Sequence, residues 1–175
     1  MTATDQTEYS ELRATIRERG TARVWIFVVG ILGWAALSVA AAALALPPLF
    51  AVVPLLALIA TFEAVYALHL GAERIGRYLE VFHEADVAGW ETRTKWLAPI
   101  PQGAKPDALF TAVFAIAAVL TLFTANLFDV TAQERWAVTV PVVLFLVRVA
   151  RAKSFAGKQR GTDLERFRQL KAENR

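Results

Sequence analysis

Residues 24–46 constrain the fold more than any other part of the chain, because they read VWIFVVGILGWAALSVAAAALAL without one ionisable side chain. An α-helix needs about 20 apolar residues to cross a hydrocarbon core of roughly 30 Å. The whole chain is 56% hydrophobic, with a mean hydropathy of +0.41, yet its charged residues are unevenly distributed. This distribution is typical of an α-helical membrane protein.

Three further apolar stretches predict additional spans. Residues 49–70 follow the first span after only two prolines, so these two spans are expected to form a tight hairpin. Residues 108–128 also carry no ionisable side chain. The stretch from Trp136 meets Arg148 before it is long enough to cross, so this arginine must be buried or reach toward a headgroup. The sequence therefore predicts an all-α integral membrane protein with four transmembrane helices arranged as two hairpins.

The positions of Lys and Arg predict the orientation, because the cytoplasmic flanks of membrane helices retain basic residues. Basic side chains precede the first span, lie between the second and third, and follow the fourth, whereas the outer connections have almost none. Both termini are therefore expected in the cytoplasm, with the chain in the plasma membrane. A cleaved signal peptide, which the small residues SVAAAALA would suit, would leave an odd number of spans and contradict this pattern.

The segments outside the spans also have helical patterns. Tyr9, Leu12 and Ile16 predict an amphipathic helix that lies on the membrane surface or against other cytoplasmic parts. The second span is expected to continue as a cytoplasmic helix to about Val87, and the tail to bend at Gly-Lys-Gln-Arg-Gly before a short helix. The expected order is a cytoplasmic helix at 1–22, spans at 24–46 and 49–70, a helix extension and interfacial loop at 71–107, a span at 108–128, an outer loop at 129–135, a span at 136–155 and a basic tail at 156–175.

Glu63 and Arg148 are ionisable residues inside expected spans, where a charge is costly without a partner. Counted from the outer ends of their helices, Glu63 lies about 21 Å deep and Arg148 about 18 Å deep. We therefore predict an intramembrane pair that fixes the packing of two helices. The alternatives are a protonated, hydrogen-bonded Glu63 and an ion or proton path through a small oligomeric channel or transporter.

The inner end of the same helix carries a polar cluster of His69, Glu73, Arg74, Arg77 and Tyr78. The i, i+4 spacing lets His69 and Arg77 each pair with Glu73, while Arg74 can face anionic headgroups of the inner leaflet. We predict that this cluster docks a partner or contacts lipid headgroups. An enzyme acting at the inner interface is the alternative, although the sequence assigns no catalytic residue.

Metal and haem sites have little support in the sequence. Glu80 and His83 have the E-x-x-H spacing of carboxylate-bridged metal bundles, but such sites need two copies and further glutamates. His69 and His83 lie about 21 Å apart along one helix, so one chain cannot place both on a haem iron, and only a homodimer could supply two axial histidines. The absence of cysteine excludes disulfides and thiolate metal sites. The sequence therefore predicts no metal and no cofactor.

Gly30 and Gly33 predict a close approach of another helix to the first span, from this chain or from a partner. The basic excess lies mainly at the inner flanks of spans, which favours an anionic leaflet over nucleic acid as its partner. The expected function is a non-catalytic membrane subunit or scaffold. It would dock a membrane-complex partner, or copies of itself as a homo-oligomer, through its cytoplasmic helices.

Overall fold

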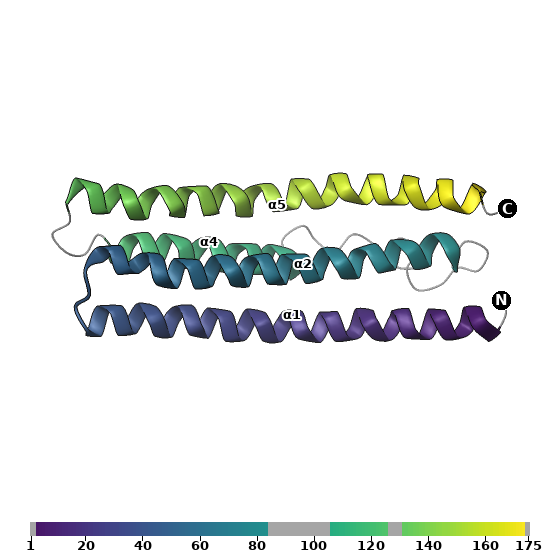
Figure 1. Cartoon of the computed structure of the whole chain (residues 1–175), viewed down its shortest axis with the longest axis horizontal. Coiled ribbons are helices and arrows are strands. Elements are labelled where there is room, and N and C mark those ends of the chain that lie inside the picture. The colour runs from purple at the N-terminus through teal and green to yellow at the C-terminus, as the bar shows by residue number, and fades with distance from the viewer. Residues whose placement is uncertain (1–2, 84–105, 126–130, 174–175) are drawn as a thin grey trace.

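The computed structural model describes residues 3–83, 106–125 and 131–173, which form helices and no strand. The elements are α1 (Ala3–Ala43), the 3-10 helix η1 (Pro48–Ala51), α2 (Val52–Phe82), α4 (Pro106–Ala125) and α5 (Ala132–Glu173). They run side by side along one long axis, with both chain ends at the same end of the bundle (Figure 1). α2 lies between α1 and α5 and packs against both.

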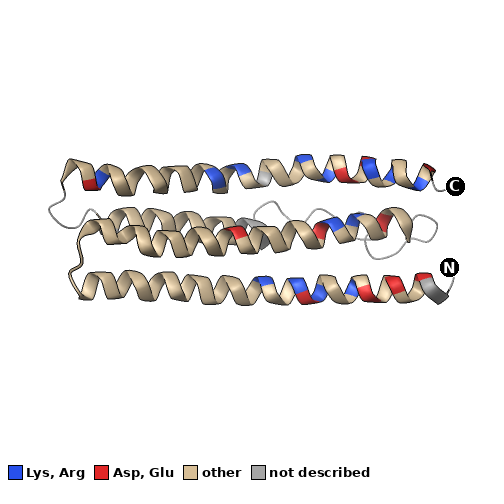
Figure 2. Ribbon diagram, viewed as in Figure 1, with Lys and Arg blue, Asp and Glu red and all other residues tan. Residues whose placement is uncertain are grey.

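Charge divides the bundle along its length into two parts (Figure 2). The apolar half comprises residues 24–68, 110–125 and 132–152, and the charged half comprises residues 3–23, 69–82 and 153–173. α4 contributes only to the apolar half. At a rise of 1.5 Å per residue, α1 with 41 residues and α5 with 42 are each about 60 Å long. These two helices therefore extend through both halves.

Aromatic rings join three helices at the centre of the apolar half. The ring of Phe62 lies 5.2 Å from that of Phe114 and 5.5 Å from that of Phe145, both in edge-to-face contact. This geometry favours the interaction of the positive ring edge with the negative ring face. Trp34 Nε1 donates a 2.9 Å hydrogen bond to Thr121 Oγ1, which ties α1 to α4. The core thus joins all four long helices within the apolar half.

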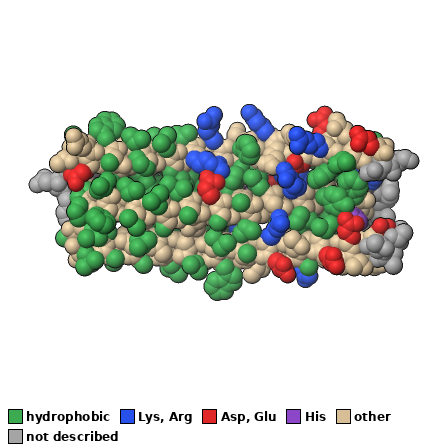
Figure 3. All heavy atoms as spheres, viewed as in Figure 1, with side chains coloured by type: hydrophobic (Ala, Val, Ile, Leu, Met, Phe, Trp, Pro, Cys, Tyr) green, Lys and Arg blue, Asp and Glu red, His purple; other side chains and the backbone are tan. Residues whose placement is uncertain are grey.

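Two helical stretches, Asp5–Ala43 and Pro48–Phe82, are long and apolar enough to cross a membrane. The apolar part of α4, Phe110–Phe123, is shorter. Large apolar side chains are exposed on the apolar half, and Figure 3 shows them covering one face of it, while charged side chains gather over the other half. Exposed apolar surface on this scale marks contact with a membrane or another protein.

Two expected boundaries differ from the structure. The segment at 1–22 is not a separate helix, because α1 continues through it into the apolar stretch and packs along α2. The expected bend between Gly157 and Gly161 is absent, since α5 is one helix to Glu173. A helical glycine costs about 1 kcal/mol relative to alanine, which packing against α2 can offset. α2 is described to Phe82, followed by a bond from the His83 N–H to the Leu79 carbonyl, and its expected continuation to about Val87 lies outside the described residues.

Candidate functional site

Arg148 is held against α2 by an acid and two aromatic rings. Its Nη2 donates a 2.8 Å hydrogen bond to Glu63 Oε2. Its guanidinium carbon lies 4.9 Å from the ring centre of Tyr66 and 5.6 Å from that of Phe62, within the range of cation–π attraction. The Tyr66 hydroxyl in turn donates to the carbonyl of Ala152 at 2.8 Å. The structure therefore brings together Glu63 and Arg148 and links α2 to α5 around them.

The predicted pair between Glu63 and Arg148 is present, but its side chains are more exposed than a pair buried between two helices would be. The Glu63 side chain is 44% exposed and that of Arg148 is 40% exposed. The pair therefore lies on the perimeter of the bundle rather than in its core. Helical rise along the sequence specifies depth, whereas exposure depends on the direction in which the neighbouring helices pack.

His69 connects α1 and α2 where the two halves of the bundle meet. Arg23 Nη1 lies 2.8 Å from His69 Nδ1, and His69 Nε2 lies 3.6 Å from Glu73 Oε1. The guanidinium of Arg23 also lies over the ring of Phe110, 5.1 Å from its centre. These contacts join α1, α2 and α4 at one level of the bundle.

Arg77 is the centre of a buried ionic network in the charged half. Its Nη1 donates a 2.7 Å hydrogen bond to Asp163 Oδ2, and its Nη2 donates to Glu73 Oε2. Arg74 Nε reaches the same Asp163 oxygen at 3.4 Å. Arg77 and Asp163 are each only 5% exposed. A buried charge needs such partners, so this network fixes α5 against α2.

The sequence-based reasoning missed Asp163 as a member of this network. The buried face of α5 repeats at intervals of three and four residues, which is the pattern of a helix packed along a seam. Its buried members are Val138, Val142, Phe145, Val149, Ala152 and Asp163. Continuing the same spacing through Ala156 and Gln159 leads directly to Asp163. Because a bend was expected at Gly157 and Gly161, the spacing of buried positions was not continued through them to Asp163.

Tyr78 on α2 contacts both α1 and α5 toward the end of the charged half that is remote from the apolar half. Its hydroxyl donates a 2.8 Å hydrogen bond to Glu8 Oε1, and its ring contacts that of Phe167 at 5.7 Å. Burial, and then the hydrogen bond to Glu8, raises the pKa of the Tyr78 hydroxyl above its ordinary value. Lys171 Nζ donates to the carbonyl of Val81 at 2.7 Å, which adds a second link between α5 and α2.

The two predicted close-packing glycines have different surroundings. A Cβ added at Gly30 would lie 2.2 Å from the Thr61 side chain, so α1 and α2 approach closely there. A Cβ at Gly33 would have no neighbouring atom within 4 Å. A Cβ at Gly71 would lie 2.3 Å from Arg19 Nη1. Gly30 and Gly71 therefore mark contacts between α1 and α2, whereas Gly33 faces open space.

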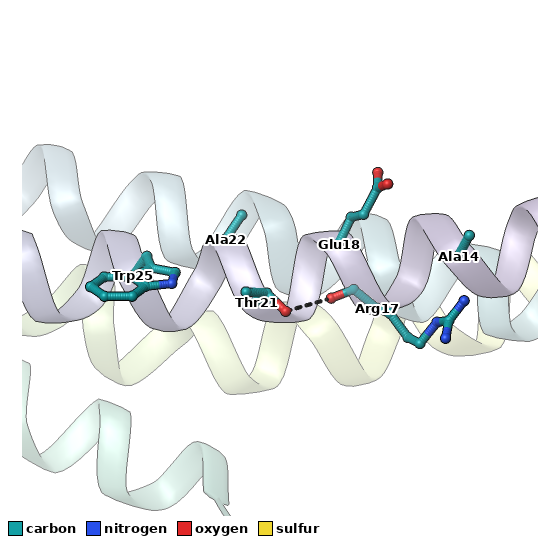
Figure 4. Close-up of a pocket in the computed structure, with 6 residues that line it drawn as sticks. All are labelled: Ala14, Arg17, Glu18, Thr21, Ala22 and Trp25. Atoms are coloured by element: carbon teal, nitrogen blue, oxygen red, sulfur yellow. Dashed lines mark hydrogen bonds between the residues drawn. The ribbon is translucent and has the colours of Figure 1, made fainter.

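A shallow pocket on α1 lies on the outer surface at the junction of the two halves (Figure 4). One helix supplies its whole lining, which consists of Ala14, Arg17, Glu18, Thr21, Ala22 and Trp25. Thr21 Oγ1 donates to the carbonyl of Arg17 at 3.1 Å, and the Trp25 side chain is exposed. An exposed indole beside basic residues suits the headgroup region of a membrane. In the described part of the chain, no group of three His, Asp or Glu residues is arranged to hold a metal ion.

The chain gives no match with known protein-family models, with curated proteins or with solved structures. Its function is therefore inferred from the side chains themselves. The polar residues described above contact one another across helices, through the Glu63 pair, the Arg77 network and the Tyr78 cluster. Such contacts position helices and present a defined outer surface.

Proposed function

We propose that this protein is a non-catalytic membrane scaffold or subunit with four spans and both termini in the cytoplasm. The apolar half lies in the bilayer in this proposal, and the charged half projects as a stalk of α1, α2 and α5. Residues 24–43 of α1 extend about 30 Å, which equals the thickness of a hydrocarbon core. Basic residues on the stalk side of each span favour a cytoplasmic stalk.

The observation that carries the scaffold proposal is the buried pair of Arg77 and Asp163. Its charges hold two helices in register about 15 Å beyond the apolar half, where no membrane would confine them. The outer surface of α5 in the stalk then presents exposed basic side chains, including Arg166 and Arg168. A rigid, charged surface of this kind suits recognition of an acidic protein partner.

The chain contains no cysteine, so single cysteines can report its orientation. Ser10 is exposed on α1 in the stalk, and Thr131 is exposed before α5 at the opposite end. We expect a membrane-impermeant maleimide to label Thr131→Cys in intact cells, and Ser10→Cys only after lysis. Labelling of Ser10→Cys from outside would refute the cytoplasmic stalk.

The scaffold role predicts that the chain purifies from native membranes in mild detergent with a partner protein at fixed stoichiometry. Charge reversal by Arg166→Glu and Arg168→Glu should remove that partner, because both side chains are exposed on the stalk. Arg135→Glu is the matched control, since Arg135 is exposed at the other end of α5. Purification of the native chain alone, or equal loss from both variants, would argue against a partner on the stalk.

A further inference from the structure

The Glu63–Arg148 pair occupies an unusual place in a membrane protein. From Pro48 and Ala132, at the outer ends of their helical segments, the two residues lie roughly 22 and 24 Å along the bundle. A core of about 30 Å would therefore enclose both charges. Since both side chains are more than a third exposed, the membrane placement proposed above would turn them toward lipid. Ionisable groups within spans usually face a bundle interior or an aqueous cavity instead.

The arginine is not arranged to reach the nearby headgroups by itself. The rings of Phe62 and Tyr66 and the carboxylate of Glu63 all hold its guanidinium on the side of α2. A guanidinium has five N–H donors and a carboxylate about four acceptor positions. The bond to Glu63 and the interaction of Arg148 with the Tyr66 hydroxyl use only part of this capacity. Hydrocarbon cannot satisfy the remaining donors and acceptors, so a polar surface is required to cover the pair.

We propose that a second copy of this chain covers the pair, through the outer face of α2 and α5. This inference depends on the proposed membrane placement. An acid beside a base is its own complement under a two-fold rotation, because Glu63 then faces Arg148 of the second copy and Arg148 faces its Glu63. Four charges of alternating sign meet at the axis. A symmetric dimer therefore needs no other protein to supply the complementary charges.

The side chains next to Glu63 permit such an approach. Ala60 and Ala67 are exposed on α2, one turn to either side of Glu63 and on the same helix face. Small residues allow the backbones of membrane helices to come close together. Exposed Leu144 provides apolar surface one turn before Arg148 on α5. The charged pair thus lies within a face that another helix pair can contact.

Cysteine crosslinking in native membranes tests this interface directly. Ala67→Cys places a thiol on the proposed face, and Val29→Cys places one at another exposed position, on α1, where the native side chain is 63% exposed. Oxidation should give about tenfold more dimer from Ala67→Cys than from Val29→Cys, because only the first thiol lies near its counterpart. Equal yields, or no dimer from Ala67→Cys, would overturn the proposal without requiring any change in the charged pair.

Complementary charge variants separate a dimer from its alternatives. Glu63→Arg gives a chain with two positive groups at this site, and Arg148→Glu gives one with two negative groups. Each variant, combined with Ala67→Cys and carrying its own tag, should lose crosslinked homodimer about tenfold because like charges now meet. Co-expression of the two should restore a crosslinked heterodimer.

Each contrary result has a distinct meaning. If the Glu63–Arg148 pair acts only within one chain, co-expression should restore no crosslinked heterodimer, because neither chain regains an opposite charge at this site. Coverage by an anionic lipid predicts that the doubly positive chain retains bound lipid and forms no heterodimer. Both results would overturn the dimer. Labelling of Ser10→Cys and Thr131→Cys reports the membrane placement independently, so failure of the dimer is distinguishable from failure of the proposed function.

Discussion

Replacing Arg77 with methionine should lower the free energy of unfolding by about 3 kcal/mol, because two carboxylates lose the cation that they share. Asp163 is almost wholly buried and cannot regain its hydration, and Glu73 also loses its bond to Arg77. Arg74 remains near Asp163, but its side chain is 55% exposed and its contact is longer. Thermal unfolding of the helices in detergent, followed by circular dichroism, measures the loss.

The matched control for this change is Arg74→Met, which should cost at most about 1 kcal/mol, because the Arg74 side chain is largely solvated and Asp163 keeps its shorter bond to Arg77. Adding Asp163→Leu to Arg77→Met should recover part of the lost stability, since the buried carboxylate is then removed together with its partner. Equal losses from Arg74→Met and Arg77→Met would show that burial does not set the strength of this network.

Gly30→Ala should destabilise the protein by roughly 2 kcal/mol, because an added Cβ forces α1 and α2 apart. The atoms in its way belong to Thr61, whose Cβ would lie 2.7 Å from the new carbon. The Thr61 hydroxyl also donates a 2.7 Å bond to the carbonyl of Ala57, which limits its movement. A lower unfolding temperature, measured by circular dichroism, would report this strain.

Gly33→Ala provides the control for steric strain, because a new Cβ there meets no atom within 4 Å. Alanine also favours a helix over glycine, so this variant should match the native chain or exceed its stability slightly. If Gly33→Ala were as damaging as Gly30→Ala, the loss would have to come from another interaction of α1, not from the contact with Thr61.

The sequence predicts the position of a residue along its helix axis better than it predicts whether its side chain points toward the core or away from it. Helical rise places Glu63 and Arg148 at similar depths, and the structure joins them by a hydrogen bond. Their position on the perimeter depends on how α2 and α5 pack, which the spacing within one chain segment does not define. For the same reason, the sequence predicts close packing equally at Gly30 and Gly33, whereas in the fold only Gly30 lies against another helix.

The network around Asp163 shows why local propensity was misleading. Two glycines in GKQRG indicate a bend when α5 is considered alone, since each glycine weakens a helix. Contacts with Arg77 and Tyr78 on α2 extend beyond those glycines and favour one continuous helix. The continuity of α5 at these glycines therefore depends on distant residues of α2. Arg77 and Asp163, for example, are separated by 86 positions in the sequence.

The unbroken course of α1 and α5 has a mechanical consequence. In the membrane placement proposed above, the part of α5 after Pro141 would move as a lever, so a change in its tilt within the bilayer would reappear at its far end. Over the about 30 Å that α5 extends beyond residue 152, a tilt of roughly 10° displaces the tip by about 5 Å. The ionic network around Arg77 and the contacts of Tyr78 couple α5 to its neighbours. α1, α2 and α5 would therefore move together and displace a partner bound at their ends.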